Sequence, residues 1–259
     1  MDNKRIVLVN DDGPESPGLL ALAGVLRNAG HDVFIATTST QKSGSSKSVS
    51  FEVRYSLGEL NGYKALIVDG TPASAVTIAL TVLRVPADII ISGINLGPNL
   101  GLWDILSSGT VGAVFEGALF GKPGVAVSLV AENSSKYEKL GFSDYENAAG
   151  VLLRILDFLE WSFPCDALNI NIPLERSGEV KVTIPERTPP RNLYMCKDNA
   201  CRMGHWSLDN SYPCVDSISD ICAVKNGAIS ITPLFIDSFG KRGMDIVEKL
   251  QNLFLNKRF

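Results

Sequence analysis

The feature that most constrains the fold is the alternation of short apolar runs with helical patterns as far as residue 172. The runs are rich in Val, Ile and Leu, and the stretches between them carry Ala and Leu at helical spacing. Strands are expected at residues 6–9, 33–36, 49–54, 65–68, 89–92, 125–129 and 168–172, and helices at 17–28, 72–83, 111–120 and 145–160. This order predicts an α/β fold whose mostly parallel sheet is covered by helices on both faces.

The character of the chain changes after Pro173. Residues 174–227 are polar and rich in Pro and Cys, residues 228–232 alternate like a strand, and residues 244–255 have the pattern of an amphipathic helix. We therefore expect one domain with a core over 1–173, a β-rich arm over 174–235 and a C-terminal helix over 236–259. Such a long excursion is unusual inside a compact domain, so the arm is expected to pack against another subunit. Its larger apolar side chains include Tyr194, Met195, Met203 and Trp206.

Composition and charge narrow the class of protein. Hydrophobic residues make up 45% of the chain, charged residues 20%, and the net charge is −4 without a basic stripe, which argues against nucleic acid as the main partner. No apolar run is long enough to span a membrane, and the N-terminus lacks a signal-peptide apolar region, so a cytoplasmic location is expected. Four of the five cysteines lie between Cys196 and Cys222. A disulfide framework is not expected in a cytoplasmic chain, and no Cys-x2-Cys pair supports a zinc site.

Two adjacent carboxylates follow the first expected strand. Asn10 follows residues 6–9, and Asp11 and Asp12 come next and precede Gly13, which permits a turn. The carboxyl ends of parallel strands are where open α/β sheets bind ligands. Two carboxylates that converge at such a turn repel each other unless a cation lies between them, so a divalent metal site is the working hypothesis. An ordinary Asp-Gly turn or helix cap is the alternative.

Three further polar segments follow strands or begin helices. Residues 42–48 form a Ser-rich loop, residues 92–101 contain Asn95 and Asn99 among Gly and Pro, and residues 107–110 begin the helix expected at 111–120. Hydroxyls and free amides at a helix start favour an anion. The alternatives are a surface loop for residues 42–48, a turn for residues 92–101 and a simple N-cap for residues 107–110.

Several common catalytic motifs are absent. The sequence contains neither Gly-x-Ser-x-Gly nor Gly-x-Gly-x-x-Gly. Residues 117–123 are one residue short of a Walker A loop and carry Pro where Ser or Thr belongs. A nucleophile-elbow hydrolase, a dinucleotide-binding domain and a P-loop enzyme are therefore disfavoured.

Taken in order, these segments resemble the survival protein SurE family, whose members are 5′/3′-nucleotidases and acid phosphatases. The resemblance runs along nearly the whole chain. It is carried by residues 9–13 with 17–18, 42–44, 70–72, 92–99, 108–110 with 116–117, 168–173 and 229–234.

The resemblance implies a Rossmann-like three-layer sandwich and a homodimer or homotetramer. It also implies one divalent metal ion per subunit, Mg²⁺ or Mn²⁺, because every ligand offers oxygen. The implied metal ligands are Asp11, Asp12, Ser43 and Asn95, with Asp11 and Asp12 as the catalytic carboxylates. The implied phosphate-binding residues are Asn99, Ser108, Gly109 and Thr110, with Ser107 assisting.

The expected activity is metal-dependent hydrolysis of nucleoside 5′-monophosphates, and possible 3′ activity stays open. A general acid phosphatase or exopolyphosphatase and a non-catalytic nucleotide sensor remain alternatives, as does half of a sugar-nucleotide glycosyltransferase. The chain departs from the family pattern around residues 102–104, where it is about one residue longer. Trp103, interpreted as a lone aromatic in a loop, is the candidate contact for base or ribose by stacking.

Overall fold

A computed structural model describes residues 3–191, 193–203 and 207–236. Its centre is a nine-stranded sheet with the order β3-β4-β2-β1-β5-β6-β7-β11-β8. All pairs from β4 to β7 are parallel, whereas β3 and β11 run antiparallel to β4 and β7. The strands of this sheet are β1 (Arg5–Asn10), β2 (Asp32–Thr38), β3 (Arg54–Leu60), β4 (Tyr63–Asp69), β5 (Ile89–Leu96), β6 (Gly124–Val130), β7 (Ala167–Pro173), β8 (Val180–Val182) and β11 (Ile229–Leu234).

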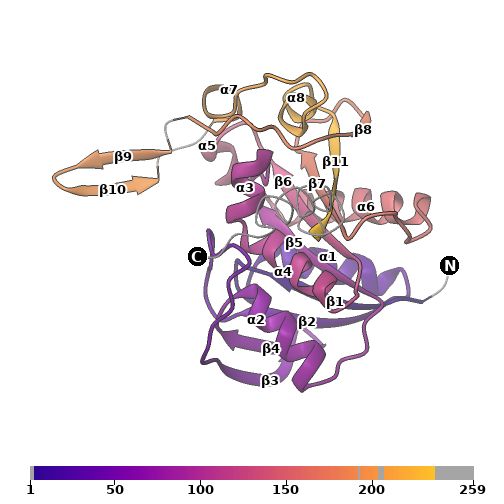
Figure 1. The fold of residues 1–259 in the computed structure, drawn as a ribbon. Helices are drawn as coiled ribbons and strands as arrows, with labels where there is room; N and C mark the ends of the chain where they lie inside the picture. Colours follow the sequence, from indigo (N-terminus) through magenta and orange to yellow (C-terminus); the bar gives the residue numbers. More distant parts are fainter. Residues whose placement is uncertain (1–2, 192, 204–206, 237–259) are drawn as a thin grey trace, which may run out of the picture.

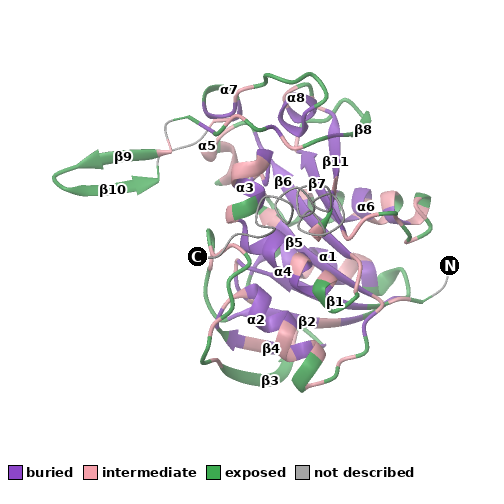
Figure 2. Ribbon diagram, in the orientation of Figure 1, coloured by how far each residue is buried: buried purple, intermediate pink, exposed green. Residues whose placement is uncertain are grey.

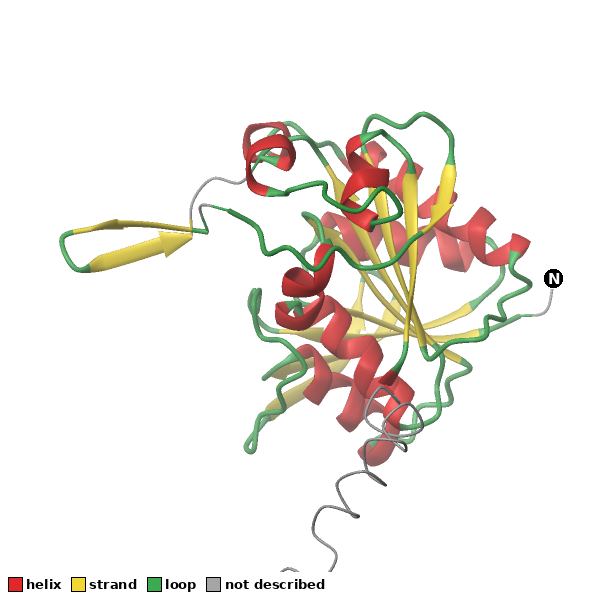
Figure 3. Ribbon diagram, turned by 45° about the horizontal axis from the view of Figure 1, so that its top comes forward, coloured by secondary structure: helices red, strands yellow, loops and turns green. Residues whose placement is uncertain are grey.

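Helices cover both faces of the sheet, which confirms the three-layer α/β prediction (Figures 1 and 3). One apolar core joins the sheet to α1 (Pro17–Asn28) and α6 (Phe142–Phe158). A second core joins the opposite face to α2 (Pro72–Thr77), the π-helical turn η1 (Ile78–Val82) and α4 (Gly109–Leu119). The central strands are buried on both faces, as Figure 2 shows, and this explains their continuous apolar sequences. None of the described helices is long and apolar enough to cross a membrane.

Shorter helices connect these layers. They are α3 (Gly101–Ser107), α5 (Ser134–Tyr137), α7 (Leu208–Ser211) and α8 (Asp220–Lys225). Two local predictions were wrong. Residues 49–53 are not a strand, because β3 begins only at Arg54, and the segment that contains Trp103 is the helix α3 and not a loop.

The C-terminal third is less separate than the sequence indicated. β11 pairs with β7 and β8 pairs with β11, so these parts of 174–235 are strands of the central sheet. Among the described residues, β9 (Tyr194–Lys197) and β10 (Ala200–Met203) form a hairpin separate from the central sheet, and it projects from the body in Figures 1 and 3. The helix expected at 236–259 lies almost wholly outside the described residues.

The expectation that the cysteines would not form disulfides was wrong. Cys196 pairs with Cys201 across the β9–β10 hairpin, and Cys214 pairs with Cys222 at α8. Cys165 is free. The expectation followed from an assumed compartment, whereas pairing depends on which cysteines the tertiary structure brings together.

Candidate active site

The two adjacent carboxylates lie at the carboxyl end of β1, in the middle of the sheet. A turn fixes their directions, because the Asn10 side chain donates to the Gly13 carbonyl at 2.8 Å and accepts from the Thr37 hydroxyl. Gly13 has φ +95°, a conformation that L side chains rarely adopt. Asp11 is 3% exposed. The turn therefore holds at least one acidic side chain inside the protein.

The start of α4 and the end of β5 meet Asp11 at this point. The Thr110 hydroxyl, which is fully buried, donates to Asp11 Oδ1 at 2.7 Å, and Asn95 Oδ1 lies 3.2 Å from the same hydroxyl. The Asn95 amide nitrogen donates to the Gly97 carbonyl at 2.9 Å, so its oxygen is the atom directed to Thr110. Three elements that are distant in sequence thus bring oxygen atoms to one place.

The electrostatics of the carboxylates suit a cation. Burial, together with the Asp11 charge, raises the pKa of Asp12 to about 7, and contacts with Leu96 and Gln41 lower it in part. Burial also raises the pKa of Asp11, against the lowering effect of the Thr110 hydroxyl. Asp12 Oδ2 is buried and has no hydrogen-bond partner among the described residues. A divalent cation would supply that missing partner and favour both ionised carboxylates.

The donors fit a hard cation rather than zinc. Within the described ranges, no group of three or more His, Cys, Asp and Glu side chains could hold a metal. The neighbourhood instead offers carboxylate, amide and hydroxyl oxygens, which Mg²⁺ and Mn²⁺ prefer.

The Ser-rich loop closes over the carboxylates and the start of α4. Lys42 N donates to the Asp11 carbonyl at 2.7 Å, and Ser46 N donates to the Ser107 carbonyl at 2.9 Å. Gly112 has no room for a side chain, since a Cβ there would lie 2.3 Å from the Ser46 carbonyl oxygen. The loop is therefore packed directly on α4.

Ser45 is the site residue that the sequence analysis missed. A Cβ on Gly109 would lie 2.6 Å from Ser45 Oγ and 2.9 Å from Asp11 Oδ2, so the hydroxyl and the carboxylate border the same small space. Ser45 Oγ is buried without a hydrogen-bond partner among the described residues. Ser43 is exposed. No local signal separates the two serines, because both belong to the same run of small residues.

The expected phosphate-binding residues around the start of α4 differ in their hydrogen-bond partners. Ser108 is the N-cap of α4 and accepts from Val111 N at 3.1 Å, while the Ser107 hydroxyl donates to the Trp103 carbonyl at 2.9 Å. Gly109 and Thr110 form the first turn of α4, whose amides have no acceptor within the helix.

Asn99 lies in a buried polar network. Its side chain donates to Ser128 Oγ at 2.9 Å, its backbone N–H donates to Asn171, and its carbonyl accepts from Asn169 and Asn171. These bonds hold the Asn99 loop against β6 and β7.

Trp103 is partly exposed on α3, the helix that immediately precedes Ser108 and α4. No described contact joins it to the carboxylates.

Comparison with known proteins identifies the family. The sequence profile described as "Survival protein SurE" matches residues 6–191. The chain belongs to the SurE family. A protein named 5′-nucleotidase SurE from Archaeoglobus fulgidus is 36% identical over 94% of this chain and 96% of its own length. Another of the same name from Desulfitobacterium hafniense is 37% identical over 90% of this chain and 91% of its own.

The fold agrees with a solved member of the SurE family. The crystal structure of the SurE protein from Aquifex aeolicus superposes with a TM-score of 0.76 at 29% identity, covering 95% of this chain and 99% of that one. This chain therefore shares its fold with that SurE protein, and the resemblance drawn from the sequence is confirmed.

Proposed function

We propose that this chain is a 5′-nucleotidase that hydrolyses nucleoside monophosphates to nucleoside and phosphate. The observation that carries the proposal is the pair Asp11 and Asp12 beside the first turn of α4, with Asp11 buried and a buried, unpartnered oxygen on Asp12. The printed names of relatives that are 36% and 37% identical support the same activity.

In this proposal, Asp11, Asp12 and Asn95 hold one divalent cation, Mg²⁺ or Mn²⁺, together with a hydroxyl of the Ser loop. Ser43 is the hydroxyl indicated by the family resemblance. A bound cation would polarise the phosphate and lower the pKa of a water molecule. Thr110 orients Asp11 by donating its hydroxyl proton to Asp11 Oδ1. That proton is therefore not available to the phosphate. Either carboxylate can accept a proton from the attacking water.

The start of α4 is the proposed phosphate site. The first-turn amides at Gly109 and Thr110 can donate to phosphate oxygens, and the helix dipole favours the negative charge. Ser45 can donate from the other side, because its hydroxyl borders the same space as Asp11. Ser107 and Asn99 then act by fixing the backbone, since the Ser107 hydroxyl proton and the Asn99 side-chain amide already have partners in the protein. The Ser108 hydroxyl accepts from Val111 N, so its own proton can be donated to a phosphate oxygen.

A phosphate-release assay tests the proposal. We expect faster release from nucleoside 5′-monophosphates than from glycerol phosphate, dependence on added Mg²⁺ or Mn²⁺, and loss of activity with EDTA. Equal rates on all monoesters would leave a general acid phosphatase, and release from polyphosphate would indicate an exopolyphosphatase. Nucleotide binding without release would leave a sensor, and full activity after EDTA treatment would overturn the metal mechanism.

Trp103 is the proposed contact for the base. Stacking of a base on an aromatic ring contributes about 1–3 kcal/mol, roughly a tenfold to hundredfold change in kcat/KM. Trp103→Ala should therefore reduce the difference in kcat/KM between nucleoside monophosphates and glycerol phosphate. An equal loss on both substrates would instead indicate that Trp103 fills space in α3 or an interface.

The proposed assembly is a homodimer or homotetramer in the cytoplasm, with the β9–β10 hairpin at an interface. The hairpin exposes Tyr194, Met195 and Met203 at 60%, 58% and 60%, and an exposed apolar patch of this kind is typical of a protein contact. Light scattering at micromolar concentration should show at least a dimer. A monomer would refute the assembly without affecting the activity.

A further inference from the structure

Helix α3 is held at its first residue by a buried carboxylate from far along the chain. Asp220 Oδ2 accepts from Gly101 N at 2.8 Å, and Asp220 Oδ1 accepts from Glu186 N at 3.0 Å and Ile221 N at 2.8 Å. Asp220 is fully buried. Its carboxylate therefore joins the start of α3 to the loop at Glu186.

Glu186 makes the second attachment. Its carbonyl accepts from Leu102 N at 2.8 Å, and a Cβ on Gly101 would lie 3.0 Å from the same oxygen. Its own carboxylate accepts from Val215 N and Asp216 N, both at 3.1 Å. Burial raises the pKa of Glu186, but these and neighbouring backbone hydrogen bonds outweigh it and lower the pKa to about 2. Glu186 is thus a charged link between α3 and the segment around Val215.

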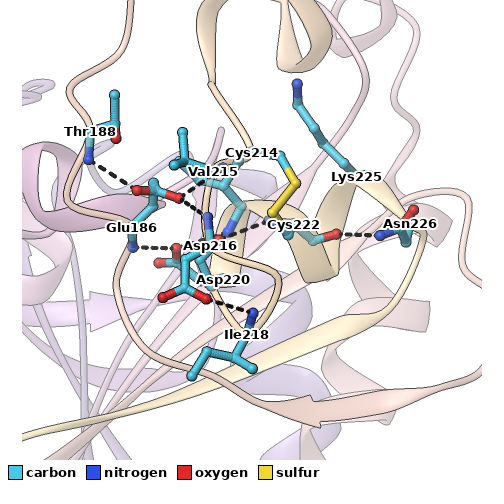
Figure 4. The surroundings of a disulfide bond; sticks show 12 residues. Glu186, Thr188, Cys214, Val215, Asp216, Ile218, Asp220, Cys222, Lys225 and Asn226 are labelled. Atoms are coloured by element: carbon cyan, nitrogen blue, oxygen red, sulfur yellow. Dashed lines mark hydrogen bonds between the residues drawn. A yellow bond between two sulfur atoms is a disulfide. The ribbon is translucent and has the colours of Figure 1, made fainter.

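A disulfide joins the two segments that bind this pair of carboxylates. Cys214 directly precedes Val215, and Cys222 lies in α8 two residues after Asp220 (Figure 4). Figure 4 shows Glu186 between the Val215–Asp216 backbone and Asp220, with the disulfide beside them. The bond therefore fixes the spacing on which both attachments to α3 depend.

We propose that Glu186, Asp220 and the Cys214–Cys222 disulfide form a redox-sensitive clamp that positions α3 for nucleotide binding. The inference rests on the proposed nucleotidase function. Helix α3 carries Trp103 and leads through Ser108 into the phosphate-binding start of α4, so loosening its first turn disturbs both sides of the substrate. Asp11 and Asp12 belong to the turn that follows β1, so the clamp acts on substrate binding rather than on the carboxylates.

The chemistry is a thiol–disulfide exchange. Cys214 is exposed, whereas Cys222 is 2% exposed. A thiolate of dithiothreitol attacks Cys214 Sγ, and Cys222 leaves as a thiolate that takes up a proton. The second reagent thiol then displaces Cys214, which leaves as a thiolate and is protonated in turn. The protein gains two electrons and two protons, and the reagent becomes a cyclic disulfide. The exposed Cys214 gives the reagent thiolate access to the disulfide.

The test compares steady-state kinetics on a nucleoside 5′-monophosphate, with metal in excess, before and after dithiothreitol. We expect KM to rise by about tenfold, as it would if the competent arrangement of α3 fell to roughly one molecule in ten, with kcat little changed. The double variant Cys214→Ser/Cys222→Ser should have the raised KM without reductant, and dithiothreitol should not change its KM further. The matched control Cys196→Ser/Cys201→Ser removes the hairpin disulfide. Its KM should be as low as that of oxidised wild type and should still rise when dithiothreitol is added.

Hydrogen exchange at the amides of Gly101 and Leu102 gives a readout that does not depend on activity. Both amides should exchange faster in reduced wild type, which also covers the case in which the serine variants fail to fold. Unchanged exchange, or an unchanged KM in the reduced enzyme, would overturn the clamp. If oxidised enzyme releases no phosphate while the amides still respond to reduction, the proposed nucleotidase function fails and the clamp stands.

Discussion

Replacing Thr110 with Val isolates one hydrogen bond at the centre of the site. The substitution keeps the shape of a fully buried side chain and removes the hydroxyl that donates to Asp11 Oδ1 at 2.7 Å. A hydrogen bond to a charged group contributes roughly 1.5–3 kcal/mol, and the acceptor left behind is buried. If that energy orients Asp11 during catalysis, kcat/KM should fall by roughly tenfold to a hundredfold.

Thr110→Val should also lower the Tm and raise the pKa of Asp11. For a chain of this size about 1 kcal/mol shifts Tm by roughly 2–4 °C, so a fall of about 3–12 °C is expected. The Thr110 hydroxyl lowers the pKa of Asp11, so its loss should raise that pKa further. Phosphate release across a metal titration and thermal melting followed by circular dichroism measure the two effects separately.

Two matched variants give the result that would refute this reasoning. Thr110→Ser keeps the donor and should retain most of the activity. Ser108→Ala removes the N-cap bond to Val111 and leaves the hydrogen bond to Asp11 in place, so it should lower stability by about 0.5–2 kcal/mol without raising the pKa of Asp11. If Thr110→Val matches Thr110→Ser in kcat/KM, the Thr110 hydroxyl does not act through Asp11.

Three further outcomes are expected. Asp12→Asn should abolish phosphate release and raise the Tm of the metal-free protein. The Tm should rise because burial and the Asp11 charge disfavour an ionised Asp12. An unchanged or lower Tm would contradict this. Gly112→Ala should displace the Ser loop and reduce activity, because its Cβ would lie 2.3 Å from the Ser46 carbonyl oxygen, whereas Gly24→Ala, with nothing within 4 Å, should leave the assay unchanged. The pKa of Glu186 is lowered to about 2 in the folded protein, so its ionised form stabilises the fold above the usual value of 4.5 and this contribution is lost as pH falls toward 2. The stability difference between wild type and Glu186→Gln should shrink over that range in pH-dependent unfolding experiments, and a constant difference would show that the charge is not involved.

Much of the fold could be predicted from the sequence, because its signals are local. Apolar runs such as residues 89–92 and 125–129 correspond to buried parallel strands, and the Ala- and Leu-rich pattern after Pro17 corresponds to α1. The position of Asp11 and Asp12 at a strand end followed from the same reasoning, since adjacent residues and a Gly turn are visible in the sequence. The order of polar segments was sufficient to identify the SurE family.

The tertiary structure decided which of those polar groups meet. Thr110 and Asp11 are 99 residues apart and Asp220 and Gly101 are 119 apart, and no periodic pattern encodes such contacts. The sequence could not separate Ser45 from Ser43, because the choice depends on how the loop packs on Gly109 and Gly112.

The remaining differences have the same physical origin. Trp103 lies in a helix because Asp220 and Glu186 bind the first amides of α3, and those partners come from a segment that local patterns left irregular. The cysteine pairs likewise depend on side chains meeting across a hairpin and beside α8. Local propensity and burial patterns are properties of neighbouring residues and can be read from the sequence. Hydrogen bonds and disulfides between distant segments exist only after the chain has folded.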